Sequence, residues 1–189
     1  MFYKVLFLEL LACASLVGWR VYQALPTTTL AVGDSVVALK TAAPRAARPA
    51  VAPLPAGSLV FPVSDHSVAD VISVFGDKRG KTRRHQGIDV KAPRGTAVVA
   101  TVDGFVERIR EGGNGGKQLY LRDARGRLFY YAHLDAWSVA EFDAVTAGQQ
   151  LGTVGDTGNA RGTTPHLHFE ILLGKERRAV DPLPYWTGA

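Results

Sequence analysis

The stretch PHLHFEILL, residues 165–173, carries two of the chain's five histidines, one residue apart, directly before an apolar run. Successive side chains of a β-strand point to opposite faces of its sheet, so residues i and i+2 share a face. If this stretch is a strand, His166 and His168 face one space together, while Leu167 and Phe169 face the other way. Two imidazoles directed at one point suit a metal site or a proton-transfer site, and an incidental surface pair is the alternative.

Short apolar runs alternate with glycine-rich turns on the N-terminal side of this stretch, back to Leu59. The pairs Asp103-Gly104 and Gly112-Gly113 separate β-branched runs, which is a hairpin signal. We therefore expect an all-β fold, a mostly antiparallel β-sandwich or half-open barrel.

Side-chain placement within these runs follows from the same two-residue period. In FVERI, Phe105, Glu107 and Ile109 are expected on one face. Tyr130 and Tyr131 are neighbours in RLFYYAHL; one is expected to pack inside, and core filling is favoured for both over a place in a cleft. DAWSVAEFDAV, residues 135–145, is the only candidate helix, and its apolar stripe is weak.

The first 20 residues are predicted to lie outside this fold. Lys4 is followed by an apolar stretch from Val5 to Trp19 that is interrupted by Glu9 and Ser15. Its length and the small residues around Cys13 are typical of an export signal, and an uncleaved membrane anchor or a lipoprotein signal is the alternative. Residues 1–20 are thus expected to be a signal peptide or membrane anchor, and the folded part is expected outside the cytoplasm.

Residues 21–58 are predicted to be an Ala/Pro-rich linker, because TAAPRAARPAVAPLPAG cannot build a core. The folded domain is then residues 59–189. From Leu59 onward there are 17 Lys and Arg against 15 Asp and Glu, a net charge of +2 of the chain's +5. This near-neutral balance argues against a nucleic-acid-binding domain.

One basic patch stands out within that balance, formed by Lys78, Arg79, Lys81, Arg83 and Arg84. A solvated loop is its simplest interpretation, and attraction of an anionic cell-wall polymer is the functional alternative.

The single cysteine, Cys13, excludes an intrachain disulfide and a thiolate zinc site, so any metal is held by His and carboxylate. RRHQGIDV places His85 and Asp89 four residues apart at the entry to a predicted strand. YYAHLDA places His133 near the end of another. Each pattern is weak alone, but a hydrolytic zinc site needs three protein ligands and an open position. A His, Asp, His set is what the sequence offers.

At these residues the chain resembles the lysostaphin-type zinc endopeptidases, also called LytM-type domains, which cut peptide cross-links of peptidoglycan. The resemblance runs from about residue 60 to residue 184. It rests on four stretches in the same order: FGDKRGKTRRHQGIDVKAPRGTAVVATVDGFV, YYAHLD, AGQQLGTVGDTGNARGTTPHLHFEI and VDPLP.

The resemblance implies that His85, Asp89 and His168 are ligands of Zn²⁺ and that His133 and His166 are unligated catalytic histidines. It implies a zinc metalloendopeptidase that acts on peptidoglycan stem peptides. The Ala/Pro-rich tether and the single folded domain favour a setting in the periplasm or cell envelope, and with it the direct cross-link (a DD-endopeptidase-like activity) over a glycine bridge. We expect His133 to act as the base and His166 as its electrostatic partner.

The alternative within the same family is a non-catalytic LytM-type domain that binds the wall and activates another hydrolase. Such domains typically lose metal ligands, whereas this chain keeps the full set. A protein regulator of the cleft, and a role for residues 21–58 in covering it, are left open by the sequence. His66 matches none of the quoted stretches and is expected on the surface.

Overall fold

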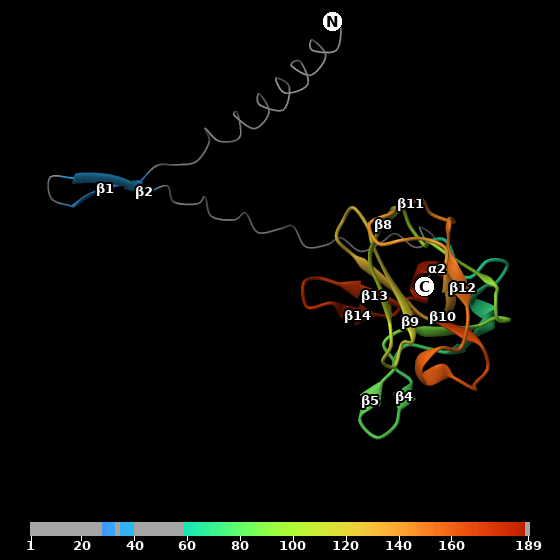
Figure 1. The fold of residues 1–189 in the computed structure, drawn as a ribbon. Coiled ribbons are helices and arrows are strands. Elements are labelled where there is room, and N and C mark those ends of the chain that lie inside the picture. The colour runs from blue at the N-terminus through green and yellow to red at the C-terminus, as the bar shows by residue number, and fades with distance from the viewer. Residues whose placement is uncertain (1–27, 33–34, 40–58, 188–189) are drawn as a thin grey trace, which may run out of the picture. The chain divides into compact units, whose positions relative to one another are not determined.

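The computed structural model describes residues 28–32, 35–39 and 59–187 (Figure 1). The predicted signal or anchor at residues 1–20 lies outside the described residues, as does most of the predicted linker. Within 21–58, strands β1 (Thr28–Val32) and β2 (Ser35–Leu39) pair antiparallel, a hairpin that the sequence analysis did not anticipate. No helix in the described part of the chain is long and apolar enough to cross a membrane.

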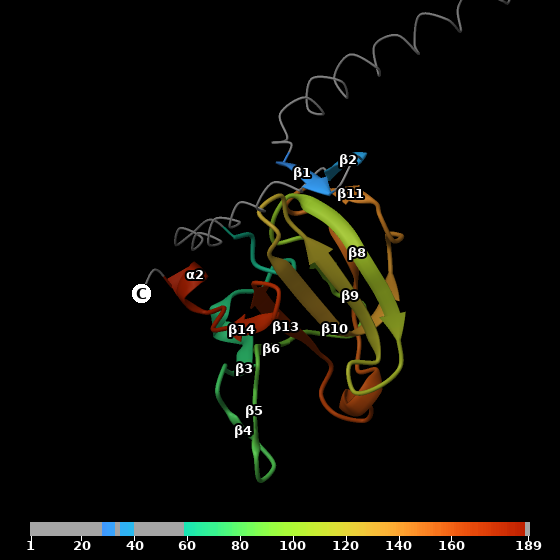
Figure 2. The same ribbon diagram turned by 90° about the vertical axis from the view of Figure 1, so that its left-hand side faces the viewer.

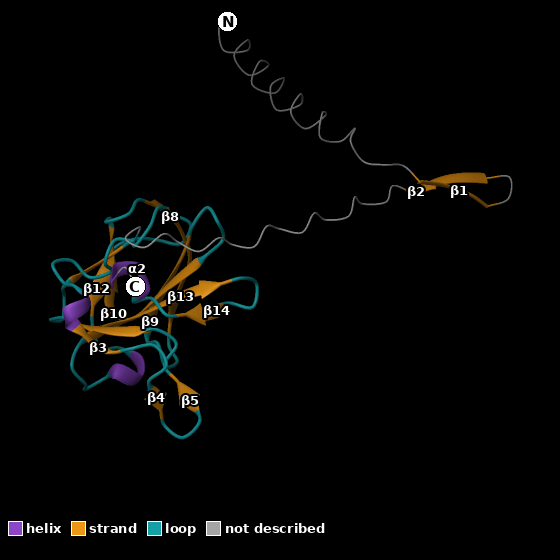
Figure 3. Cartoon of the chain, turned by 180° about the vertical axis from the view of Figure 1, so that it is seen from behind, coloured by secondary structure: helices purple, strands orange, loops and turns teal. Residues whose placement is uncertain are grey.

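The regular structure of the part from Leu59 onward consists almost entirely of strands, which are joined by loops and turns (Figure 3). Its strands are β3 (Val71–Ser73), β4 (Lys78–Arg79), β5 (Arg83–Arg84), β6 (Ile88–Lys91), β7 (Ala97–Val99), β8 (Gly104–Glu111), β9 (Lys117–Arg122), β10 (Leu128–Trp137), β11 (Ala144–Val145), β12 (Gln150–Val154), β13 (His166–Leu173) and β14 (Arg178–Val180). Its helical segments are short: η1 (Val68–Asp70), η2 (Gly158–Ala160) and α2 (Pro184–Thr187).

Ten of these strands form one sheet in which every pairing is antiparallel. Seven of them follow the order β11-β8-β9-β10-β13-β6-β3, and β7, β12 and β14 lie off this path, with β14 paired to β13. Figure 2 shows β8, β9 and β10 side by side in this sheet. The first half of β10 pairs with β9 and β13, and its end pairs with β12, which continues to β7. The expected all-β, mostly antiparallel fold is therefore confirmed.

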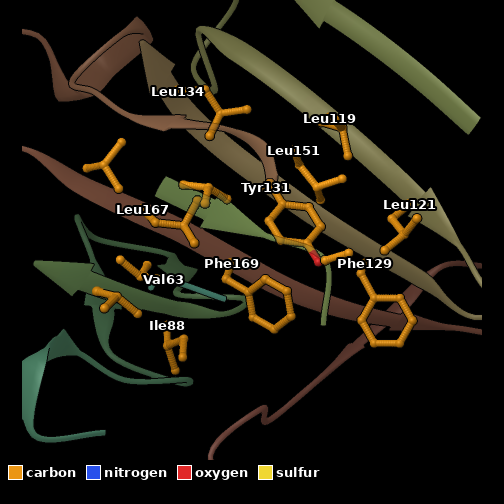
Figure 4. Packing of buried hydrophobic residues seen from close by; sticks show 14 of the residues in the cluster. Val63, Ile88, Leu119, Leu121, Phe129, Tyr131, Leu134, Leu151, Leu167 and Phe169 are labelled. Atoms are coloured by element: carbon orange, nitrogen blue, oxygen red, sulfur yellow. The ribbon is translucent and has the colours of Figure 1, made fainter. Parts of the chain in front are cut away.

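The hydrophobic core covers one face of the central strands (Figure 4). Phe129 and Tyr131 on β10, and Leu167 and Phe169 on β13, are fully buried, and each pair is separated by one residue. Tyr131 keeps its hydroxyl paired inside the core with the backbone N–H of Thr101, at 3.1 Å. The two-residue period of the strands thus assigns alternate residues to the core and leaves those between them on the opposite face.

Two sequence expectations differ from the structure. In FVERI the buried residue is Val106, and Phe105 is 39 % exposed, because the β8–β9 register shifts between Val106 and Arg108. A bulge of this kind breaks the two-residue period, so residues on either side of it exchange faces. The weak helix candidate at 135–145 is not a helix: it consists of the end of β10, turns and β11.

Substitution of Phe169 by Ala should lower the free energy of unfolding by about 3–5 kcal/mol, because it leaves a cavity between Phe129, Tyr131 and Trp186. Denaturant unfolding of the full chain measures this loss. Phe142→Ala is the matched control: Phe142 is 75 % exposed, so its removal should change stability by less than about 0.5 kcal/mol. Equal losses in the two variants would contradict this assignment of the core.

Candidate metal centre and its cleft

Three neighbouring strands bring together the residues of the candidate site. In the β13–β6 pairing, His168 lies directly opposite Asp89, and in the β10–β13 pairing it lies opposite Ala132. His166 and His168 alternate with the buried residues Leu167 and Phe169, as the sequence predicts for a strand.

His85 lies just before β6, where backbone bonds with Asp77 and Gly76 hold it. The chain between His85 and Asp89 passes close to β13 at Gly87. A Cβ atom at this position would lie 2.0 Å from the carbonyl oxygen of Phe169, so only glycine fits there. The reason is close packing and not a left-handed backbone.

His85, Asp89 and His168 place three donor atoms in a small triangle. His85 Nε2 lies 3.1 Å from Asp89 Oδ1 and 3.0 Å from His168 Nδ1, and the third side, from His168 Nδ1 to Asp89 Oδ1, is 2.8 Å. Within the described part of the chain, these three residues form a group of His and Asp side chains whose ligand atoms all lie within 4.8 Å of one another, close enough to hold one metal ion.

Hydrogen bonds behind the two imidazoles determine which nitrogen faces the triangle. His85 Nδ1 donates to the carbonyl oxygen of Val74 at 2.9 Å, and His168 Nε2 donates to Glu170 Oε1 at 2.8 Å. With both imidazoles neutral, lone pairs of His85 Nε2 and His168 Nδ1 converge on the same point as a carboxylate oxygen. Such convergence is unfavourable unless positive charge lies between the donors.

The electrostatics agree with a site for positive charge. Burial alone would raise the pKa of Asp89, but hydrogen bonds from His168 and His85 outweigh it and hold that pKa well below its usual range. Burial likewise opposes a charge on His168, yet bonds to Asp89 and Glu170 raise its pKa to about 9.

The donor set fits zinc. Zinc bonds of about 2.0–2.1 Å to nitrogen or oxygen in a tetrahedron place neighbouring ligand atoms about 3.3 Å apart, close to the three measured sides. Two imidazole nitrogens and one carboxylate oxygen are ordinary zinc ligands, and three protein ligands leave one position open.

His133 lies beside this triangle in a strained backbone conformation. Its φ is 62°, a left-handed value that is rare for a residue with a side chain. The register of β10 with β9 shifts between Tyr131 and Leu134, which flank this residue, and its N–H bonds Gly115 O at 2.9 Å instead of a strand partner. The left-handed conformation removes His133 from the regular alternation of β10.

The ring of His133 is held by the loop that contains η2. Its Nδ1 donates to the carbonyl oxygen of Thr157 at 2.8 Å, which leaves Nε2 as a proton acceptor. Burial lowers the pKa of His133 to about 4, so the imidazole is neutral near pH 7. The Thr157 side chain is itself fixed, because its hydroxyl donates to Leu134 O and accepts from the N–H of Lys117.

His166 is oriented in the same way. Its Nδ1 donates to the carbonyl oxygen of Thr164 at 2.8 Å, and its ring centre lies 5.0 Å from that of His133. Arg94 forms ion pairs with Asp135 and with Asp156, and so ties the start of the η2 loop to the end of β10. Both histidines therefore stand on elements that are braced against each other.

The cleft that contains all five predicted site residues has a volume of about 870 Å³. The β4–β5 hairpin contributes Arg79, Thr82 and Arg83 to its lining, and the η2 loop contributes Asn159 and Ala160. The basic patch thus lies partly along the cleft, whereas His66 is half-buried, bonds the carbonyl oxygen of Ser64 through Nδ1 and is not part of the lining.

Sequence reasoning favoured the wrong role for one contributor and missed two others. Tyr130 lines the cleft, donating its hydroxyl to Gln118 at 2.9 Å, so the preference for core filling holds for Tyr131 only. The signal available in the sequence was the alternation of faces along β10, which places neighbouring residues such as Tyr130 and Tyr131 on opposite sides. The same alternation along β13 places Glu170 on the face of His168, two residues before it, so this contributor was also predictable. The carbonyl of Thr157 carried no such signal, because every residue has a carbonyl.

Curated relatives that match part of the chain include an endopeptidase and a hydrolase activator. The protein named DD-carboxypeptidase/endopeptidase Mpg of Neisseria meningitidis is 46 % identical over 101 residues, which cover 53 % of this chain and 22 % of the relative. The murein hydrolase activator NlpD of Escherichia coli is 35 % identical over 119 residues, which cover 61 % of this chain and 28 % of the relative. The chain thus matches only about a quarter of the length of either.

Among solved structures, the catalytic domain of lysostaphin from Staphylococcus simulans superposes with a TM-score of 0.56 at 30 % identity, covering 61 % of this chain and 90 % of that domain. Residues 83–182, more than half of the chain, match the family model described as Peptidase family M23. The resemblance to lysostaphin-type peptidases is therefore confirmed, and the chain belongs to peptidase family M23.

Proposed function

We propose that this protein is a zinc metalloendopeptidase that hydrolyses peptide cross-links of bacterial peptidoglycan. One observation carries the proposal: three donor atoms about 3 Å apart share a cleft with two histidines whose Nε2 atoms are left as acceptors. Metal-assisted hydrolysis needs both parts, a cation site with an open position and groups that move protons beside it.

In this proposal His85 holds zinc through Nε2, His168 through Nδ1 and Asp89 through Oδ1. A bound zinc ion supplies Lewis acidity, which polarises a peptide carbonyl and makes water more acidic. Glu170 and the carbonyl of Val74 keep the two imidazoles in the tautomers that this role requires.

His133 and His166 handle the protons. His133 donates Nδ1–H to Thr157 O, so its Nε2 accepts a proton from the attacking water. The peptide C–N bond breaks, the hydroxyl of water remains on the carbonyl carbon, and the proton passes to the leaving amine. His166, with its ring centre 5.0 Å from that of His133, stabilises negative charge on the carbonyl oxygen in its imidazolium form, in which Nε2 carries a hydrogen while Nδ1–H stays bonded to Thr164 O.

The substrate class rests on the relatives and on the charge of the cleft. Mpg is named as a carboxypeptidase and endopeptidase of the DD type, which favours direct D-amino-acid cross-links over glycine bridges. Arg79 and Arg83 in the lining suit an anionic wall peptide. Residues 1–20 as an export signal or anchor, residues 21–58 as a tether and a peptidase domain from 59 would then place the cleft in the cell envelope.

A second candidate function is activation of another wall hydrolase without hydrolysis by this chain. The similarity to NlpD, which is named as a murein hydrolase activator, favours it. The complete set of donors and auxiliary histidines favours the peptidase, because an activator needs none of them. The same experiments distinguish the two functions.

The purified full chain should bind one zinc ion, and His168→Ala should weaken zinc binding by more than about 100-fold, since loss of a ligand costs more than loss of an outer partner. Metal content and chelator competition measure this. His66→Ala is the matched control, because His66 lies outside the cleft and should leave zinc affinity unchanged. A wild-type chain that binds no zinc would overturn the proposed metal site.

With zinc bound, the chain should convert cross-linked muropeptides to monomers, and a chelator should stop the reaction. His133→Asn should reduce turnover by about 10²–10⁴-fold while zinc stays bound, because it removes the proton acceptor only. Asn is chosen since it tolerates the left-handed backbone at this position. Mass analysis of the muropeptides is the measurement. Intact cross-links in the presence of zinc-loaded wild type, together with faster cleavage by a second hydrolase, would establish the activator instead.

A further inference from the structure

Arg79 connects the β4–β5 hairpin to the candidate metal centre. It is the last residue of β4, directly before the Gly80 turn, and its Nη2 forms an ion pair with Oδ2 of Asp89. The hairpin projects from the rest of the folded part in the views of Figures 1 and 2. The Arg79 side chain is 40 % exposed, whereas that of Asp89 is 7 % exposed, so the ion pair joins the cleft surface to a buried carboxylate.

The two oxygens of Asp89 have different partners. Oδ1 faces His85 and His168, whereas Oδ2 is occupied by Arg79. A carboxylate with both oxygens accessible binds zinc through one or through both, and the second mode uses the position that water or substrate needs. We propose that Arg79 is a positioning residue that holds Oδ2 of Asp89 away from the metal, so that Asp89 contributes one oxygen only. This inference rests on the proposed zinc site.

Ser73 extends the role of Arg79 to a second ligand. Its hydroxyl accepts a bond from Arg79 Nη2 at 2.9 Å, donates to Asp77 Oδ2 at 2.7 Å and lies 3.2 Å from His85 Nδ1. Arg79 therefore contacts Asp89 directly and reaches the outer side of His85 through one hydroxyl. Outer groups of this kind orient metal ligands and typically change metal affinity by about 10–100-fold.

The sign of the effect distinguishes positioning from simple charge. Arg79 is a cation close to a site for a cation, so by Coulomb repulsion alone its removal would strengthen zinc binding. If it positions Asp89, its removal weakens zinc binding, because Oδ2 is released and the ligand becomes free to turn.

The experiment uses the full chain with Arg79→Met, which keeps an apolar stem of similar length, and Arg79→Ala. Both variants should bind zinc about 10–100-fold more weakly than wild type in chelator competition. With cobalt(II) in place of zinc, the visible absorption should lose intensity, because a second oxygen from Asp89 raises the coordination number above four. Circular dichroism of the metal-free variants should match that of wild type, since the hairpin lies at the surface.

Arg83→Ala is the matched control. Arg83 carries the same charge, pairs with Arg79 across the same hairpin and lines the same cleft, but its side chain makes no ion pair or hydrogen bond to a residue in the described part of the chain. Its loss should leave zinc affinity within about threefold of wild type and the cobalt spectrum unchanged. Arg79 variants that bind zinc as tightly as wild type, or more tightly, and keep its cobalt spectrum would overturn the inference. A wild-type chain that binds zinc but leaves cross-links intact would overturn the proposed function alone.

Discussion

The antiparallel register of β6, β13 and β10 is the constraint on which the site depends. It sets His168 opposite Asp89 on one face, while Phe169 lies opposite Ile88 on the other. A slip of one residue would turn every side chain of a strand to the wrong face, exposing fully buried residues such as Phe169. The hydrophobic core therefore enforces the register, and the register in turn places the polar donors. Core stability and site geometry are two consequences of the same pairing.

Local patterns in the sequence predicted the parts of the site that depend on local geometry. Alternation in PHLHFE gives the orientation of His166 and His168, because a two-residue period needs no knowledge of neighbouring strands. The gathering of His85, Asp89 and His168 is different, since no spacing reveals which strands pair. That part came from the resemblance to a known family, and the structure brings the three donors together. Their roles in binding zinc stay a proposal.

Features that depend on departures from regular structure were beyond the sequence. The bulge near Val106 changes which residues of β8 face the core, and no residue type signals it. In the sequence, Arg79 is one of five basic residues whose simplest interpretation is a solvated loop. Its ion pair with Asp89 forms only when the chain folds and brings the hairpin close to that carboxylate. The Thr157 carbonyl that orients His133 is backbone. Tertiary contacts, not composition, determined all three.

The left-handed conformation of His133 has an architectural consequence. Past this residue β10 no longer pairs with β13, and from Leu134 onward it pairs with β12, so the change of strand partner and the candidate proton acceptor share one position. Replacing the side chain of His133 removes the proton acceptor and leaves the path of the backbone in place. Inserting or deleting one residue nearby would disturb both the backbone path and the acceptor. In this chain the segment from Tyr131 to Asp135 must therefore keep its residue count, whereas the tip of the β4–β5 hairpin is under no such constraint.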